Sequence, residues 1–174
     1  MNIDDCHITV IPTGSAHELG MRPFLLDCLS IREQVFCEEQ QVAFDVEQDG
    51  KDHESGHILL WMKNVPVGTL RFRRTDEGLR LERVAVLKPY RGLSYGKLLI
   101  RAGVRAARQE NPEGPIYLHA QTSALGFYEK MGFIPVGDEF NEGGLPHRSM
   151  LLPGEEERSI LAEACGKDVA EQAG

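Results

Sequence analysis

The sequence predicts an α+β fold in which helices cover both faces of a mixed, mostly antiparallel sheet. Short β-rich runs follow one another across turn sequences, which is typical of an antiparallel meander. Longer segments carry apolar residues at helical spacing. The length of 174 residues fits one domain, which buries a core without the support of disulfides or a metal.

The first half of the chain is predicted to contain one helix and four strands. Turn sequences at 64–66 and 75–78 separate the strands that follow an acidic stretch, and Pro89 ends the last of them. The predicted elements are a strand at 7–12, a helix at 23–36, an acidic loop at 38–55, and strands at 57–63, 66–73 and 79–86.

The second half is predicted to alternate helices and strands. Helical spacing is established from Leu98 and ends near Asn111, and Gly132 ends a second, shorter helix. We interpret residues 1–153 as a single domain and residues 154–174 as an acidic tail that is weakly helical or frayed. The predicted elements are a helix at 98–111, a strand at 116–120, a helix at 123–131, and strands at 133–136 and 146–152.

The charges are unevenly distributed around a net charge of −8. Residues 1–60 hold three Lys and Arg against twelve Asp and Glu, residues 71–110 hold eleven against four, and residues 111–174 hold four against eleven. A basic centre favours an anionic ligand and acidic flanks favour a cationic one, although a solvated charged surface explains the pattern equally well. The net negative charge argues against nucleic-acid binding.

The cysteines and the N-terminus favour a cytoplasmic protein. The cysteines are scattered without a C-x-x-C pair, which is typical of free thiols in a reducing compartment. The N-terminus is acidic rather than basic, and no apolar run approaches the roughly 20 residues that span a bilayer. We therefore expect no membrane association. The cysteines are Cys6, Cys28, Cys37 and Cys165.

A turn with small residues leads from the strand at 79–86 into the helix that follows. Small residues let main-chain N–H groups approach a ligand, and a helix start adds unpaired donors and a positive dipole end. With its two cationic side chains, the turn favours a pyrophosphate. It is not a Walker A loop, because Leu98 replaces the Ser or Thr that would bind magnesium. The turn reads Arg91-Gly92-Leu93-Ser94-Tyr95-Gly96-Lys97.

This turn resembles the acyl-CoA pyrophosphate loop of the GNAT N-acetyltransferase superfamily, Arg/Gln-x-x-Gly-x-Gly/Ala. Arg91 and Gly96 match, and Ser94 stands where the middle glycine is usual. Residues 124–133 resemble the downstream A-x-x-F-Y-x-K-x-G-F element of the same superfamily. The ElaA/YjcF-like branch is resembled by segments at 32–40, 117–121 and 142–150, in the expected order.

The resemblance implies the GNAT fold and an acetyl-CoA-dependent N-acetyltransferase that needs no metal. An uncharged primary amine would attack the thioester directly, through a tetrahedral intermediate with an oxyanion. The end of the strand would pair with the pantetheine amides, and the loop would hold the pyrophosphate. The implied cofactor-binding residues are Val84, Ala85, Val86, Arg91, Gly92, Leu93, Ser94, Tyr95, Gly96, Lys97 and Lys130.

The resemblance also implies catalytic residues. Tyr128 is the implied general acid, because a protonated phenol can donate to the departing thiolate. The general base stays open among Glu82, His119 and His147, each of which has a structural or solvated role as its alternative.

The acceptor is expected to be a small-molecule or peptide amine. Gln121 is a polar contact for it, and Glu39, Asp49 and Asp52 would make the acceptor end negative and so attract a cation. A solvated surface loop explains these carboxylates equally well. The edges of such a sheet are compatible with a homodimer.

Two other motifs are weaker. Residues 53–57, HESGH, match the zinc-protease pattern H-E-x-x-H, but Gly56 and the apolar run after it predict a loop entering a strand rather than a helix. Residues 45–56 begin like a calcium-binding EF-hand loop, but Gly56 stands where a bidentate Glu is required. The alternatives to the acetyltransferase are a non-catalytic acyl-CoA-binding regulatory module and, less favoured, a zinc hydrolase.

Overall fold

The computed structural model describes residues 5–154 of the chain. These residues form two compact units, which we call the N-terminal unit, ending at Pro112, and the C-terminal unit, starting at Glu113. The predicted domain at 1–153 includes the N-terminal unit and the C-terminal unit as far as Pro153, and the predicted tail lies outside the described residues except for Gly154. Within residues 5–154, no helix is both long and apolar enough to cross a membrane.

Four antiparallel strands form the sheet of the N-terminal unit. Each strand pairs with the next one along the chain, which confirms the predicted meander. The second strand is buried along its whole length except at Trp61, as expected where both faces of a sheet are covered. The strands are β1 (Cys6–Ile11), β2 (Gly56–Met62), β3 (Val65–Thr75) and β4 (Gly78–Val86).

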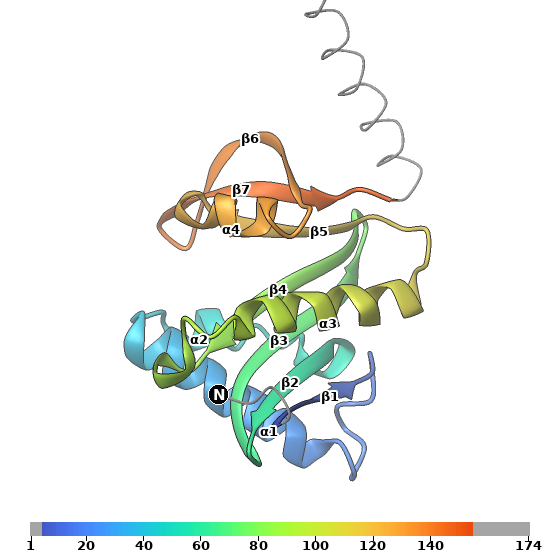
Figure 1. Cartoon of the computed structure of the whole chain (residues 1–174), viewed down its shortest axis with the longest axis vertical. Helices are drawn as coiled ribbons and strands as arrows, with labels where there is room; N and C mark the ends of the chain where they lie inside the picture. Colours follow the sequence, from blue (N-terminus) through green and yellow to red (C-terminus); the bar gives the residue numbers. More distant parts are fainter. Residues whose placement is uncertain (1–4, 155–174) are drawn as a thin grey trace, which may run out of the picture. The chain divides into compact units, whose positions relative to one another are not determined.

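Two helices cover opposite faces of this sheet, α1 (Arg22–Arg32) and α3 (Tyr95–Glu110) (Figure 1). Cys28 of α1 packs in one apolar cluster with Leu59 of β2. On the other face, Gly103 of α3 lies so close to β3 that a Cβ there would meet the Leu70 side chain at 2.9 Å. Helices on both faces are therefore confirmed for this unit.

The structure differs from the predicted elements around the acidic stretch. The first helix ends earlier than predicted and continues as a π-helical turn over Glu33–Glu39. The predicted loop at 38–55 contains the short helix α2 (Phe44–Glu47) and a 3₁₀ turn at Asp52–Glu54. Carboxylates of this stretch form ion pairs with buried arginines, which hold it in place. The hydropathy pattern of the sequence does not reveal such ion pairs.

Strand β4 carries a bulge just before its end. Thr69 pairs with Ala85 and Arg71 pairs with Glu82, so β4 has one more residue than β3 between these pairs. Arg83 at the bulge has a φ of +52°, which is uncommon for a residue with a side chain. The bulge changes the direction of the strand directly before residues 84–86.

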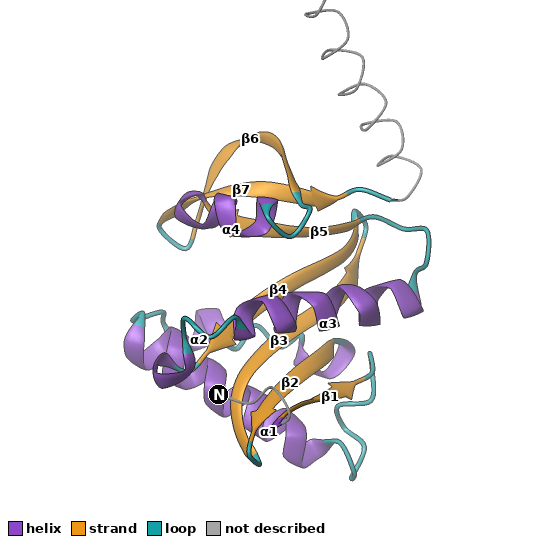
Figure 2. Cartoon of the chain, in the orientation of Figure 1, coloured by secondary structure: helices purple, strands orange, loops and turns teal. Residues whose placement is uncertain are grey.

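The C-terminal unit has three strands, β5 (Ile116–Gln121), β6 (Ile134–Glu142) and β7 (Leu145–Leu152), and the short helix α4 (Leu125–Glu129) (Figure 2). β7 pairs antiparallel with both other strands. β6 is longer than predicted, because a register shift after Val136 lets it continue beyond this position.

Candidate active site

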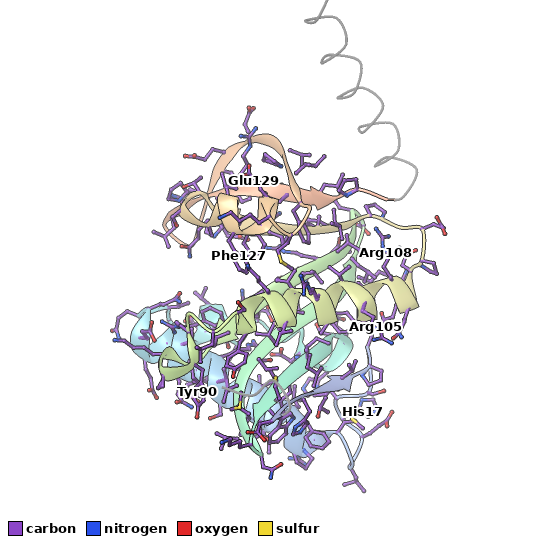
Figure 3. The ribbon with its side chains drawn as sticks, in the orientation of Figure 1. His17, Tyr90, Arg105, Arg108, Phe127 and Glu129 are labelled. Carbon is purple, nitrogen blue, oxygen red and sulfur yellow. The ribbon has the colours of Figure 1, made fainter. Side chains whose placement is uncertain are left out.

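The turn between β4 and α3 is a loop whose main chain is left-handed at two positions. A 3₁₀ turn at Lys88–Tyr90 follows β4, and Tyr90, which is labelled in Figure 3, is its last residue. Gly92 and Ser94 have φ values of +79° and +65°. Glycine accepts this conformation without strain, whereas serine does so at a small energetic cost.

The same loop presents a row of unpaired main-chain donors. Among the residues that the structure describes, the N–H groups of residues 92–96 have no hydrogen-bond acceptor. The helix begins to bond with the N–H groups of Lys97 and Leu98, which both donate to the Ser94 carbonyl. The first turn of α3 holds no acidic side chain. Such consecutive free donors at a helix start suit an anion such as a phosphate group.

Arg91 opens the loop, and its side chain contacts protein groups. Its Nε donates to the Val86 carbonyl at 2.9 Å. Its Nη1 and Nη2 donate to the two Glu39 carboxylate oxygens at 2.5 and 2.9 Å. Glu39, predicted to contact the acceptor, is therefore held at the loop between β4 and α3.

The main chain at residues 84–86 leads from the bulge into this loop. Ala85 is buried and pairs with Thr69, and Val86 pairs with Gly68. A Cβ at Gly68 would lie 3.1 Å from the Ala85 carbonyl, so a glycine here allows β3 and β4 to approach closely.

Asp49 and Asp52 belong to a buried ion-pair network. Arg71, which is fully buried, contacts Asp49 at 2.5 Å and Asp52 at 3.1 Å, and Arg32 contacts Asp52 at 2.5 Å. Burial acts to raise the pKa of each aspartate, but hydrogen bonds from Arg71 and Arg32 outweigh it and hold both pKa values below their usual range.

These contacts correct the expectation that Asp49 and Asp52 attract a cationic acceptor. Their charges are neutralised by arginines inside the protein, so they stabilise the acidic stretch against β3. Glu47 lies in the same network, 2.5 Å from Arg32.

Glu82 is also enclosed by arginines. Its carboxylate lies 2.9 Å from Arg71, 2.6 Å from Arg73 and 3.3 Å from Arg80. The side chain is almost completely buried, and both oxygens are used in ion pairs. The Glu82 carboxylate is thus held in ion pairs inside the protein, and this placement favours the two histidines as the base.

In the C-terminal unit, three predicted site residues share one face of the sheet. His119 and Gln121 are two residues apart on β5, so their side chains point to the same face of the sheet. Gln121 is the direct cross-strand partner of His147 on β7. Their side chains thus lie on the same face, opposite to the one that holds buried Leu118 and Met150.

Two further residues on this face were not among the predicted site residues. Glu142 lies 3.3 Å from His119 Nδ1. Phe140 packs edge-on against His119 with ring centroids 4.8 Å apart, and stacks on His147 at 6.2 Å. Both come from the part of β6 that lies beyond the predicted end of the strand, which is why the sequence did not place them here.

Tyr128 lies in α4 with its hydroxyl uncommitted. Its ring packs edge-on against Phe127, which is labelled in Figure 3, and against Phe133. Its hydroxyl has no hydrogen-bond partner within residues 5–154. Burial raises the pKa of Tyr128 above its ordinary value, so the phenol stays protonated at neutral pH. Lys130, which follows α4, is exposed.

The zinc-protease pattern does not form the helix that its chemistry needs. His53 lies in the 3₁₀ turn, whereas His57 is a fully buried residue of β2. His57 Nε2 lies 3.0 Å from the Asp52 carbonyl oxygen. Within the described part of the chain, no three His, Cys, Asp or Glu side chains are grouped so that they could hold a metal ion.

Comparison with known proteins shows the family to which the chain belongs. A family model described as an acetyltransferase (GNAT) domain matches residues 25–152. The chain is 38% identical over 128 residues to YjcF of Bacillus subtilis, described as an uncharacterized N-acetyltransferase, which covers 73% of this chain and 91% of YjcF.

Two crystal structures share the fold. Escherichia coli ElaA matches with a TM-score of 0.74 and 29% identity, over 85% of this chain and 99% of ElaA. An acyl-CoA N-acyltransferase from Pseudomonas aeruginosa matches with a TM-score of 0.75 and 25% identity, over the same shares of the two chains. The chain therefore belongs to the GNAT acetyltransferases and has their acyl-CoA N-acyltransferase fold.

Proposed function

We propose that this protein transfers an acetyl group from acetyl-CoA to a primary amine, by direct attack of the amine nitrogen on the thioester carbon. The observation that carries the proposal is the row of unpaired N–H groups at residues 92–96, at the start of a helix whose first turn has no acidic side chain. Membership of the GNAT acetyltransferases supports acyl transfer as the reaction class.

The residues of the loop fit the diphosphate of CoA. Main-chain donors bind phosphate oxygens without the entropic cost of ordering long side chains, and Lys97 adds a positive charge at the same helix start. The main chain of residues 84–86 would pair with the pantetheine amides. Acetyl-CoA would supply a thioester carbonyl that is activated toward nucleophiles, and exposed Lys130 would interact with its phosphates.

Tyr128 is proposed as the general acid. A proton on its hydroxyl is available at neutral pH, because burial raises the pKa of the phenol and no described residue accepts a hydrogen bond from it. Such a hydroxyl can donate to a thiolate as the thiolate leaves.

His119 is proposed as the general base, with Glu142 orienting its ring. An imidazole nitrogen can take the proton of an ammonium, and a carboxylate beside Nδ1 would orient the ring so that Nε2 is the nitrogen that does so. His147 is the alternative base. It is the weaker choice, because its Nδ1 lies near the Leu145 carbonyl and no carboxylate lies beside it among the described residues.

The acceptor is proposed to be a small-molecule or peptide amine that contacts the face with Gln121, Phe140 and Glu142. Glu142 lies beside His119 on this face, and 43% of its side chain is accessible. It can attract a cationic amine while Phe140 offers an apolar surface to the carbon chain.

The proposal is tested by incubating the protein with acetyl-CoA and a panel of polyamines, amino sugars, small amines and lysine peptides, and measuring the release of free thiol. We expect thiol release above the amine-free rate for at least one class. Tight CoA binding with no amine-dependent release from any class would favour the non-catalytic acyl-CoA-binding module instead.

A further inference from the structure

We infer that Glu39 is a positioning residue for the cofactor loop, and that it acts by holding the side chain of Arg91. The inference rests on the proposed acetyl-CoA site. It assigns Arg91 a different task from direct binding of the diphosphate, which a cationic residue at the start of such a loop would otherwise suggest.

The contact is a two-pronged ion pair between segments that are far apart in the sequence. Arg91 Nη1 and Nη2 each donate to a different oxygen of Glu39, at 2.5 and 2.9 Å. A planar guanidinium and a carboxylate in this geometry fix each other's orientation as well as their distance. The Arg91 hydrogen bond is the largest of the effects that hold the pKa of Glu39 below its usual range, so the carboxylate is ionised at neutral pH.

Glu39 is presented by an anchored segment rather than by a free loop. It is the last residue of the π-helical turn, and the N–H of the next residue, Gln40, donates to the Val35 carbonyl at 3.2 Å. Val35 is buried in the apolar cluster of α1. The Glu39 side chain therefore extends from a segment of main chain that is anchored to the packed core.

On the other side of the pair, Arg91 is tied to β4. Its Nε donates to the Val86 carbonyl at 2.9 Å, and its main-chain N–H donates to the Lys88 carbonyl at 3.3 Å. The side chain therefore links the end of β4 to the π-helical turn, and three of the five donors of its guanidinium face protein oxygens.

The Glu39–Arg91 pair fixes the position of the residue that directly precedes the row of free N–H groups at 92–96. Residues 92–96 follow Arg91 directly, and they include two left-handed positions, one of which is a serine. A loop with this backbone gains affinity when it is held in its binding conformation before the ligand arrives. We expect the Glu39–Arg91 pair to provide that restraint, while the diphosphate is bound by the main-chain donors and Lys97.

Substitution of Glu39 shows whether Arg91 binds the diphosphate or positions the loop, because the two roles predict opposite changes in CoA affinity. If Arg91 were a diphosphate ligand, Glu39→Gln would release its charge and strengthen CoA binding. If Glu39 positions Arg91, the same change loosens the loop and weakens binding. We expect a rise in the dissociation constant of at least fivefold, measured by calorimetry with CoA.

Glu38→Gln is the matched control, because it removes the same charge from the neighbouring exposed position. Within the described residues, the Glu38 side chain has no ion pair. It should bind CoA like the parent, which separates local positioning from a general change in surface charge. Thermal unfolding should be the same in both variants, since the Glu39–Arg91 pair is partly exposed.

Arg91→Lys provides the second test. A lysine keeps the charge that a diphosphate would need but cannot form the planar fork to Glu39 and the bond to Val86 together. We expect it to weaken CoA binding as much as Arg91→Gln does, and the double variant Glu39→Gln, Arg91→Gln to be no weaker than either single one.

The outcomes distinguish this inference from the proposed function. Unchanged or tighter CoA binding by Glu39→Gln in a parent that binds CoA, or parent-like binding by Arg91→Lys, would overturn the positioning role alone. A parent that does not bind CoA would overturn the proposed acetyl-CoA site, and this inference with it.

Discussion

The Tyr128 side chain provides the sharpest test at the level of single residues. Tyr128→Phe removes one oxygen and leaves the ring that packs against Phe127 and Phe133. We expect kcat to fall by roughly 10²-fold or more, the usual scale for a positioned acid. CoA affinity and thermal stability should change little, because the hydroxyl has no partner to lose within the described residues.

The Tyr128→Phe comparison requires a substrate for which chemistry is rate-limiting, since slow product release can hide a chemical defect. A tyrosine with a structural role would behave in the opposite way, with turnover kept and about 1 kcal/mol of stability lost. That result would move the acid role to water or to a histidine.

The His119–Glu142 pair makes a graded prediction. His119→Gln should lower kcat by roughly 10²-fold, because it removes the base, whereas Glu142→Gln should lower it by about tenfold, because the imidazole remains but loses its orienting partner. Glu139→Gln on the same strand is the control, since this residue is exposed and should leave kcat unchanged. Equal kcat values for parent and His119→Gln would shift the base to His147.

Among the elements, the loop that leads into α3 is tested by Gly96→Val. A β-branched side chain among the free N–H groups would keep a diphosphate away from the main chain. We expect CoA affinity to fall by more than tenfold, or about 1.4 kcal/mol, in calorimetry.

Gly20→Val is the matched control for that substitution. Gly20 is an exposed glycine of the same unit, and a Cβ there would meet nothing within 4 Å. It should bind CoA like the parent. Parent-like affinity of a folded Gly96→Val protein would instead exclude the loop as the diphosphate site.

Some of the helices and strands could be predicted from the sequence alone, and others could not. The meander β2–β4 and the helix α3 were predictable, because alternation, turn residues and a run of helical spacing are local signals. The donor row at 92–96 was predictable from a motif for the same reason. β6 was predicted too short, since its continuation depends on a register shift against β7.

The contacts that join distant segments were not predictable. The sequence predicted that Asp49 and Asp52 attract a cationic acceptor or form part of a solvated surface loop, but their arginine partners come from α1 and β3. Glu142 meets His119 only because β7 pairs with both β5 and β6. Long-range ion pairs of this kind depend on topology, which local patterns do not contain.

For the whole molecule, the buried His57 predicts how stability depends on pH. Burial lowers its pKa, so the folded protein holds a neutral imidazole, whereas an unfolded histidine takes up a proton near pH 6.5. The stabilising contribution is complete above pH 6.5 and is lost as the pH falls below it, by at most about 1.4 kcal/mol per pH unit.

His57→Gln should therefore show a smaller drop in unfolding free energy between pH 7.5 and about pH 5.5 than the parent, in denaturant titrations. Asp49 and Asp52, whose pKa values are lowered by the arginines, should add a second loss in both proteins only below about pH 4. Identical drops in parent and variant would contradict the neutral state of the buried histidine.

The central claim, acetyl transfer from acetyl-CoA to an amine, is tested most directly by the ratio of free thiol to acetylated amine formed in one reaction, with the amine measured by mass spectrometry. Direct attack by the amine predicts one thiol for each acetylated amine, and loss of both products in Gly96→Val. Thiol release without an acetylated amine would show hydrolysis of the thioester and would contradict the claim.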